Sequence, residues 1–291
     1  MAGENRRPPR QDEESGHEPH RKMVRDHPLE EPQKSYHTTL EQQLADAEEQ
    51  LERPALGLSL SALTAGLDLG FSGFVMAVLL TMLGTIAPQP ILDLVVANAY
   101  TVGFIFVVIG RSELFTEHTT IAVLPVLARR SSLARLLRLW AIVLVANLVG
   151  AAAFAAFIAH LGPELGLIER HAFAEIARPV LEPGPGLMFL SAVLAGWLMG
   201  LLAWLTSSAR DTMSQIVIVW LTTLVIGLGK LHHSITGSVE VLMAVFAGVG
   251  PTMADWATFL LWAVLGNAVG GTVFVAVLKY GHVRGSHSGK P

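Results

Sequence analysis

The chain of 291 residues contains no cysteine, and that absence excludes disulfide bonds, a thiolate nucleophile and any cysteine-ligated metal site. Charged residues are scarce as well, at 15% of the chain, and aromatic residues make up 7%. Hydrophobic residues, by contrast, reach 52%, and the mean hydropathy is +0.49. A soluble domain of this length carries more charge and fewer apolar residues. The composition therefore predicts a protein that is embedded in the lipid bilayer.

Sequence patterns typical of membrane-embedded enzymes are also missing. The chain contains neither a His-Glu-x-x-His nor a Gly-x-Ser-x-Gly pattern. Glu117 and His118 follow Thr116 directly, but one acid and one histidine are too few for a metal site or an activated nucleophile. We therefore expect no enzymatic activity, no cofactor, no metal site and no nucleic-acid partner.

The first 35 residues are rich in Arg, Glu, Pro and His and have almost no apolar content. Such a segment cannot bury enough surface to offset the entropy of ordering, so we predict that it is disordered, and it lacks the apolar core of a signal peptide. Beyond it, Thr38 and Glu41 have the spacing of a capping box, and Pro54 is a stop signal. The apolar residues between them fall on one helical stripe: Leu40, Leu44, Ala47 and Leu51. Residues 1–54 are thus predicted to be a tail that is first disordered and then forms a short amphipathic helix.

Six long apolar segments follow the tail. They lie at 66–85, 91–111, 136–161, 186–206, 216–229 with a continuation through 239–249, and 256–279. A hydrocarbon core of ~30 Å needs about 20 apolar residues per helix. Helices and closed barrels alone satisfy their backbone hydrogen bonds in lipid, and no alternating strand pattern is present. We therefore predict an all-α membrane domain with six transmembrane helices over 55–284, followed by a C-terminal tail at 285–291.

Basic residues indicate how these helices are oriented. The connection after the second segment carries four arginines and no nearby acid: Arg129, Arg130, Arg135 and Arg138. The connection after the third segment instead mixes acidic and basic residues. Because short cytoplasmic loops carry an excess of Lys and Arg, we assign the arginine-rich connection to the cytoplasm. With six helices, both termini are then cytoplasmic.

Two landmarks occur twice in the chain. A polar stretch interrupts both the second and the fifth segments, and each stretch begins with a glycine and a basic residue. These pairs are Gly110-Arg111 and Gly229-Lys230. At matching distances beyond the glycines, Asn147-Leu-Val-Gly in the third segment is answered by Asn267-Ala-Val-Gly in the sixth. Three helices followed by three more insert with opposite orientation, so the sequence predicts two inverted three-helix repeats.

The two polar stretches predict that the second and fifth helices are broken. Breaks are tolerated in a membrane where the exposed backbone faces protein or a water-filled cavity, so they mark a permeation pathway. We assign Gly110, Glu113 and Gly229 to the structure of the breaks. Two interpretations of Arg111 and Lys230 remain open. Either the pair concentrates anions in the pathway, or neighbouring acids and carbonyl groups neutralise it as a structural tie.

The residues at the breaks resemble those of the formate/nitrite transporter family. The resemblance rests on Glu113-Leu-Phe-Thr and His233-Ser-Ile and covers residues 66–282, including the glycine-rich start of the first segment and the turn at 207–210. It implies an aquaporin-like fold and a homopentamer in which each subunit has its own pore. It also implies passage of monovalent anions such as formate, nitrite, hydrosulfide or lactate across the inner membrane of a bacterium.

By the same resemblance, His233 corresponds to the family's central pore histidine and Thr116 to the loop threonine beside it. The apolar side chains that narrow the pore in the family correspond to Leu114 and Phe115. The chain departs from the family pattern around the histidine, where it has His232 in place of an acid and Gly237 in place of asparagine.

A bare anion in an apolar constriction loses its hydration at a cost of several kcal/mol or more, so protonation near the middle lowers the barrier. Histidine, with an unperturbed pKa of about 6.5, suits such an exchange. We therefore expect proton-linked passage in which His233 contacts the anion or exchanges a proton, with Thr116 orienting the ring. A purely structural role for a buried His233 remains an alternative. Adjacent helical residues point about 100° apart, so we expect one of His232 and His233 to face the pore.

Asn147 and Asn267, each near a glycine, are expected to hydrogen-bond the broken helices rather than contact the substrate. An aquaporin-type water or glycerol channel shares the inverted architecture, but its paired Asn-Pro-Ala signature is absent. A non-transporting membrane scaffold or sensor that acts through the long, charged N-terminal tail remains open. That alternative predicts that deletion of the tail changes a phenotype while flux stays intact.

Overall fold

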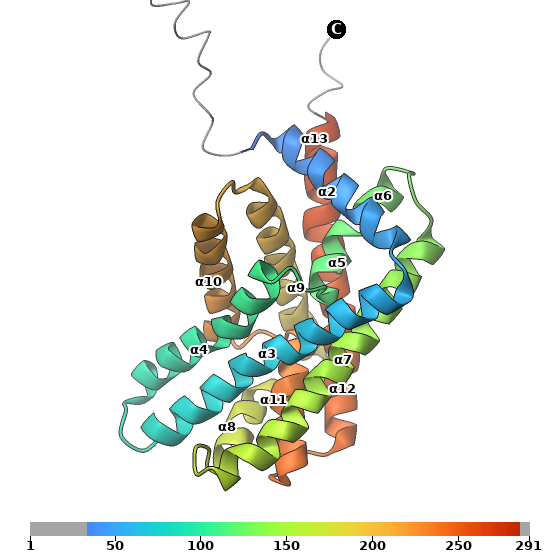
Figure 1. The fold of residues 1–291 in the computed structure, drawn as a ribbon. Helices are drawn as coiled ribbons and strands as arrows, with labels where there is room; N and C mark the ends of the chain where they lie inside the picture. The colour runs from blue at the N-terminus through green and yellow to red at the C-terminus, as the bar shows by residue number, and fades with distance from the viewer. Residues whose placement is uncertain (1–33, 286–291) are drawn as a thin grey trace, which may run out of the picture. The chain divides into compact units, whose positions relative to one another are not determined.

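The computed structural model describes residues 34–285, and the described part of the chain is helical (Figure 1). The helices are α2 (Tyr36–Glu52), α3 (Ala55–Leu83), α4 (Gln89–Ile109), α5 (Phe115–Ile121), α6 (Leu124–Leu127), α7 (Leu133–Glu164), α8 (Arg170–Leu181), α9 (Pro185–Ser208), α10 (Thr212–Leu228), α11 (Ser234–Ala247), α12 (Met253–Gly271), a π-helix (Thr272–Val277) and α13 (Leu278–Gly285). Most of the segment predicted to be disordered, and residues 286–291 of the predicted C-terminal tail, lie outside the described residues.

Four of the described helices are long and apolar enough to span a membrane: α3, α4, α7 and α9. Helices α10 and α11 are also apolar but shorter. Large apolar side chains are exposed on these elements, among them Leu60, Leu94, Val149 and Leu190. Such exposure is expected where a helix faces lipid or another subunit. The predicted all-α fold with apolar spans is therefore confirmed, and the count of six spans stays a prediction.

The first two helices begin earlier than the sequence patterns indicated. Helix α2 begins at Tyr36, because the hydroxyl of Ser35 accepts the backbone N–H of Thr38, so the predicted capping box at Thr38 is wrong. Helix α3 begins at Ala55, eleven residues before the predicted apolar segment. Its first turns alternate leucines with Gly57, Ser59 and Ser61, and this mixture hid the helix from a search for apolar runs.

Helix α8 was not predicted at all. It lies in the connection after α7, where the mixed charges indicated a loop. Ala172, Phe173, Ile176 and Ala177 are buried along one side of it, and it packs against α11. The element is thus a short amphipathic helix that lies along α11. Its first residue, Arg170, donates to the carbonyl oxygen of Ala247 at the end of α11, and Val180 near its own end pairs with His232 beside the start of α11.

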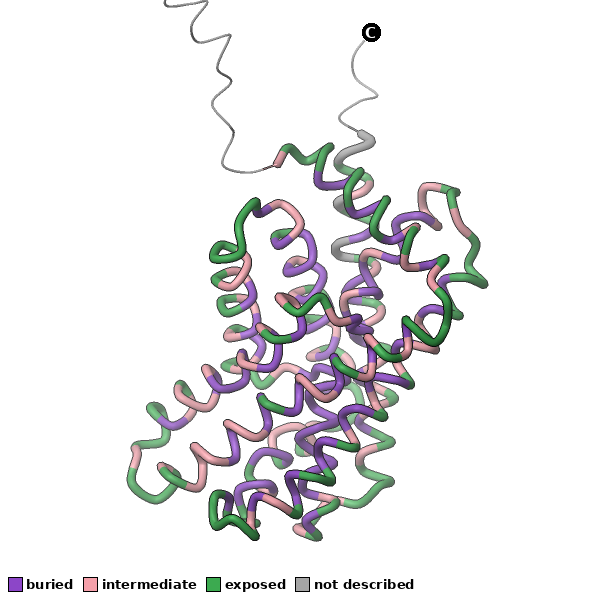
Figure 2. Tube along the Cα trace, viewed as in Figure 1, coloured by how far each residue is buried: buried purple, intermediate pink, exposed green. Residues whose placement is uncertain are grey.

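The helices form two sets of three that pack in the same way (Figure 1). Helix α3 packs against α7 and α4, and α9 correspondingly packs against α12 and α10. The sets meet through α10 on α4 and α11 on α7. Helix α10 has an exposed outer side, whereas almost every residue of α11 is buried (Figure 2). The two segments that follow the predicted breaks, α5 and α11, therefore lie inside the bundle.

Candidate functional site

The helical path is interrupted at both predicted positions. Helix α4 ends at Ile109 and α5 begins at Phe115; helix α10 ends at Leu228 and α11 begins at Ser234. We call residues 110–114 the first break and residues 229–233 the second break. Arg111 (φ 55°) and Lys230 (φ 49°) both adopt the left-handed conformation directly after the glycine that closes the preceding helix. The two breaks therefore turn the chain in the same way.

One buried asparagine holds the first break. Asn147 accepts the N–H of Phe115 through Oδ1 at 2.9 Å. Its Nδ2 donates to the carbonyl oxygens of Ala62 (2.7 Å) and Glu113 (2.9 Å). One side chain thus satisfies two backbone groups at the break, the N–H of Phe115 and the carbonyl group of Glu113, and ties the break to a carbonyl group of α3.

Asn267 does the same for the second break. Its Oδ1 accepts the N–H of Ser234 at 2.9 Å, and its Nδ2 donates to the carbonyl oxygens of Ala192 and His232, both at 2.9 Å. Both asparagines are fully buried. Asn147 and Asn267 therefore act on the backbone of the breaks, through the type of contact that their positions suggested.

Two glycines bring the helices close enough for these bonds. A Cβ atom on Gly66 would overlap the carbonyl oxygen of Asn147, and one on Gly196 would overlap the carbonyl oxygen of Asn267. The backbones of α3 and α7, and of α9 and α12, are therefore in direct contact at these points. This close approach follows the general rule that small residues mark helix contacts in membranes.

Thr116 and His233 meet between the two breaks. The hydroxyl oxygen of Thr116 lies 2.8 Å from Nε2 of His233, and both residues are buried. Nδ1 of His233 accepts the backbone N–H of Thr236 at 3.2 Å and caps α11. Because Nδ1 is an acceptor, the proton of the neutral ring is on Nε2, and Nε2–H donates to Thr116.

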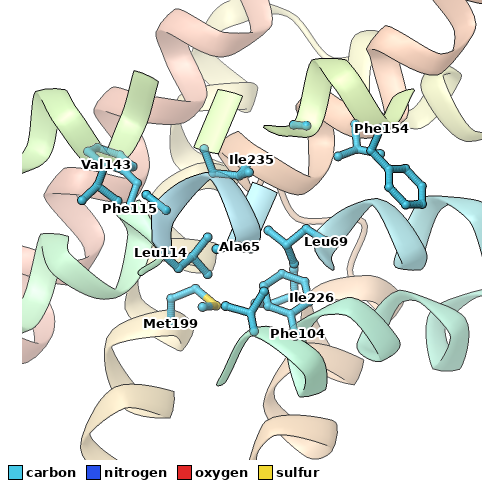
Figure 3. Packing of buried hydrophobic residues seen from close by; sticks show 14 of the residues in the cluster. Ala65, Leu69, Phe104, Leu114, Phe115, Val143, Phe154, Met199, Ile226 and Ile235 are labelled. Carbon is cyan, nitrogen blue, oxygen red and sulfur yellow. The ribbon is translucent and has the colours of Figure 1, made fainter. Parts of the chain in front are cut away.

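Apolar side chains surround this hydrogen bond. Leu114, Phe115 and Phe104 belong to one buried hydrophobic cluster (Figure 3). The ring of Phe104 meets the ring of His233 edge-on, with centroids 5.1 Å apart. Phe115 packs against Trp140 in the same manner at 6.0 Å. Phe104 was not predicted, because one aromatic residue in an apolar span carries no distinctive pattern.

Two separate cavities lie at opposite ends of α4 and α10. The larger, of about 460 Å³, is lined by residues of α2, the first break, the C-terminal end of α4 and the N-terminal end of α10. The smaller, of about 180 Å³, is lined by residues of α8, the second break, the N-terminal half of α4 and the C-terminal end of α10. We call them the α2 cavity and the α8 cavity. His233 lines the α8 cavity, and Glu117 and His118, directly after Thr116, line the α2 cavity.

The two charged residues of the first break, Arg111 and Glu113, differ in their contacts. Glu113 accepts from Arg53 at 2.6 Å and pairs with Nε2 of His118 at 2.5 Å. Its partner is thus the arginine that follows α2, and not Arg111, which is exposed and lines the α2 cavity.

In the second break, Lys230 is exposed and lies 3.5 Å from Asp93. His232 pairs with the hydroxyl of Ser191 at 2.8 Å and with the carbonyl oxygen of Val180 at 3.0 Å. His232 and Lys230 also line the α8 cavity. Across residues 34–285, no group of three or more His, Asp and Glu side chains is arranged to hold a metal ion.

Comparison with known proteins identifies the family. Residues 37–281 match the sequence model of the formate/nitrite transporter family. The chain is 35% identical over 251 residues to the inner membrane protein YfdC of Escherichia coli (strain K12). The aligned residues cover 84% of this chain and 78% of that protein. It is 26% identical over 227 residues to the nitrite transporter NirC of Salmonella typhimurium (strain LT2), covering 76% of this chain and 81% of that protein.

Solved structures have the same fold. A channel described as an FNT family ion channel superposes with a TM-score of 0.72 at 23% identity, covering 87% of this chain and 99% of the channel. A pentameric formate channel with formate bound superposes with a TM-score of 0.63 at 24% identity, covering 79% and 98%. The paired breaks, the buried Thr116–His233 contact and these similarities lead to one conclusion: the chain belongs to the formate/nitrite transporter family.

Proposed function

We propose that the chain lets small monovalent anions, weak acids such as formate and nitrite, cross the membrane together with protons, and that His233 is the residue that contacts them at the constriction. The observation that carries this proposal is the buried Thr116–His233 hydrogen bond between two cavities at opposite ends of the same helices. Family membership supports anion transport as the general activity.

The proposal includes six spans in two inverted repeats with an aquaporin-like arrangement. The asparagine contacts align Phe115 with Ser234 and Glu113 with His232. Under this alignment, residues of the first break and α5 line the α2 cavity, and their counterparts in the second break and α11 line the α8 cavity. Equivalent residues that face opposite ends of the bundle are expected for halves related by an axis in the membrane plane.

The chemistry of the constriction favours a weak acid over a strong one. An anion that reaches the buried pair meets Nε2–H of His233 as a donor, but it also meets the apolar side chains of Phe104 and Leu114. A bare anion there loses several kcal/mol of hydration or more, and a protonated acid loses far less. We therefore infer that His233 orients the substrate by hydrogen bonding and that net passage is linked to protons.

We also propose a homopentamer in the bacterial inner membrane with both termini in the cytoplasm. The exposed apolar faces of the spans require lipid or neighbouring subunits, and the similar formate channel is described as pentameric. The similar Escherichia coli protein is described as an inner membrane protein. The arginine-rich connection at 129–138 supports the cytoplasmic assignment of the α2 side.

The test is uptake of formate, nitrite, hydrosulfide, lactate and acetate into proteoliposomes, with and without an inward proton gradient. We compare the full chain with His233→Asn. Asparagine is a good N-cap and retains the bond to the N–H of Thr236, so α11 should keep its start. His160→Asn is the matched control, since His160 is exposed on α7 and lines neither cavity.

We expect gradient-driven uptake of at least one anion by the wild type and by His160→Asn, and its loss in His233→Asn. Uptake by His233→Asn at the wild-type rate, with assembly intact, contradicts the role of His233. If no anion moves through an intact wild-type oligomer, the transport function itself is wrong, and the scaffold alternative becomes the better hypothesis.

A further inference from the structure

Glu240 is a buried carboxyl group that has no role in the passage of anions past His233 as proposed above. It lies on α11, is 5% exposed and lines the α8 cavity together with His233. Among the described residues, no hydrogen bond or ion pair joins its carboxyl oxygens to another side chain or to the backbone. A buried carboxylate without a partner is costly, so this group needs water, a ligand or a proton at the cavity.

A second unpartnered polar group faces it from another helix. Tyr100 on α4 is also 5% exposed and lines the α8 cavity, and its buried hydroxyl has no hydrogen-bond partner in the described structure. The Tyr100 hydroxyl lies near the side chain of Thr236, one turn before Glu240 on α11, but it makes no hydrogen bond of good geometry to it. A phenol and a carboxyl group that converge on one small cavity from two helices, both unsatisfied, form a site for a small polar ligand.

The position of Glu240 places this site on the path to the constriction. His233 and Glu240 are separated by seven residues, about two helical turns or ~10 Å, and so lie on one face of α11. Gly237 lies between them on that face, and a Cβ atom there would overlap the ring of Phe259. Helix α11 runs from the second break away from the Thr116–His233 contact, so Glu240 lies about two turns farther from that contact within the same cavity.

The charges around the cavity do not favour a free anion at this point. Lys230 of the second break is paired with Asp93 of α4 at 3.5 Å. On α8, Arg178 is paired with Glu175 at 3.0 Å. These two pairs leave Glu182 at the mouth and Glu240 inside without a basic partner among the described residues.

The remaining neighbours of Glu240 do not compensate for its charge. His232 of the second break is engaged with Ser191 and Val180, and the lining residues contributed by α3 and α10 carry no charge. With an excess of acid, the cavity repels a bare anion while Glu240 is ionised. An anion therefore enters when Glu240 carries its proton, and it moves on most easily as the neutral acid.

His233 is poorly placed to supply the proton for that neutral form. Its Nδ1 accepts the N–H of Thr236, and its Nε2–H is directed to Thr116. A second proton on Nδ1 would break the cap of α11 and set two donors against each other. His233 is therefore suited to donate a hydrogen bond, and the exchangeable proton must come from another group.

We propose that Glu240 is the proton-exchange residue of the α8 cavity and that the Tyr100 hydroxyl holds the weak acid beside it; this inference rests on the function proposed above. In the exchange, the O–H bond of the Glu240 carboxyl group breaks, and the proton forms a bond to an oxygen or sulfur atom of the incoming anion. The products are the neutral acid, which proceeds to His233, and the Glu240 carboxylate. A proton from the solution on the α8 side, carried through the cavity as hydronium, then restores the Glu240 carboxyl group and leaves water behind.

The test uses the full chain in proteoliposomes with formate and nitrite as probes, and a pH-sensitive dye inside the vesicles reports proton entry. Glu240→Gln keeps the size of the side chain but cannot exchange a proton, and Glu240→Asp restores the carboxyl group. Tyr100→Phe removes the unpartnered hydroxyl. Glu164→Gln is the control, because Glu164 is an exposed acid on α7 that lines neither cavity. Oligomer assembly and thermal stability are measured for every variant.

We expect Glu240→Gln to assemble normally and to lose proton-linked uptake by at least about tenfold, with a flattened pH profile, and Glu240→Asp to recover part of it. Tyr100→Phe should raise the KM several-fold with the proton linkage retained, and Glu164→Gln should stay within about twofold of wild type.

A wild-type rate and pH profile in Glu240→Gln, alongside a loss in His233→Asn, overturns the role of Glu240 and leaves the proposed function standing. If the wild type itself moves anions without protons, the proton linkage fails, and the role of Glu240 fails with it. A loss of uptake that the Asp variant does not restore, with reduced stability of Glu240→Gln, also overturns the proposal in favour of a structural role.

Discussion

The first and second breaks satisfy their backbone hydrogen bonds with the same types of residue, but they present different side chains to their cavities. Each break begins with a glycine and a left-handed basic residue and is held by a buried asparagine through three hydrogen bonds. The first break adds an acid, Glu113, that is tied to Arg53 and His118. The second adds two histidines, one of which caps α11. The fold therefore depends on what the breaks share, and the chemistry depends on where they differ.

Substitutions at the glycines where two helices approach most closely should have the largest effect on stability in both halves. Gly66→Ala and Gly196→Ala each place a methyl group on the backbone oxygen of an asparagine, and backbone atoms cannot move aside cheaply. We expect each change to cost about 3 kcal/mol or more and to prevent recovery of an assembled oligomer. Gly57→Ala, with no atom within 4 Å of the new methyl group, is the control. Size-exclusion profiles of detergent-solubilised protein measure the outcome, and normal assembly of either variant contradicts the packing described here.

Substitution of either buried asparagine should lower the stability nearly as much, and to the same extent in the two halves. Asn147→Ala and Asn267→Ala each leave one buried N–H and one carbonyl group of the break without this partner. At about 1 kcal/mol or more for each group, both variants should lose roughly 2 kcal/mol and melt at a clearly lower temperature. Asn98→Ala removes a half-buried asparagine of α4 whose two hydrogen bonds, to the Leu94 carbonyl and from Trp220, are exposed to the surroundings, and it should change the melting temperature less. A large effect in one half and none in the other would show that the two breaks are not held alike.

Much of this comparison was predictable from the sequence, because the repeated landmarks are local. A glycine and a basic residue within an apolar run cannot continue a membrane helix without exposing its backbone, so the positions of the breaks followed directly. The role of Asn147 and Asn267 followed from their recurrence at matching distances. The contact of Thr116 with His233 was predicted through family resemblance, since 117 residues separate the two in the chain.

What the sequence did not show depends on which residues face one another across the bundle. Tyr100 and Glu240 lie in apolar spans as single polar residues, and nothing local indicates that they line one cavity. Glu113 is one of the acids that neighbour Arg111 in the chain, but its partner is Arg53, which the turn after α2 brings to it from 60 residues away. Helix α8 was missed because its buried residues span less than two turns and its charges resemble those of a loop.

Substitutions at Arg111 and Lys230 can separate the role of the backbone conformation from the role of the charge. Arg111→Gly and Lys230→Gly remove the charge and suit the left-handed conformation, so we expect stability within about 1 kcal/mol of wild type. Lys230 is paired with Asp93, whereas no described acid lies in an ion pair with Arg111. The Arg111 change should therefore lower uptake more, by a few-fold at low salt and less at high salt. Equal uptake by wild type and both variants would favour the structural interpretation of the pair. Arg111→Lys, which retains the charge, is the control.

The start of the broken helix also differs between the halves, and this difference should produce the smallest effect. Helix α4 begins after Pro88 with no side-chain cap, whereas Asp211 caps α10 by accepting the N–H (2.9 Å) and the hydroxyl (2.6 Å) of Ser214. These hydrogen bonds, with the Ser214 hydroxyl first, hold the pKa of Asp211 below its usual value. A carboxyl group whose pKa is lower in the folded state stabilises the fold above its unfolded pKa. That contribution disappears as the pH falls through the folded pKa.

Asp211→Asn should therefore lower the melting temperature slightly at neutral pH and not at acid pH. Glu164→Gln, which changes an exposed acid on α7, should leave the melting temperature unchanged. A difference between wild type and Asp211→Asn that persists at acid pH would mean that the charge of Asp211 is not what stabilises the start of α10.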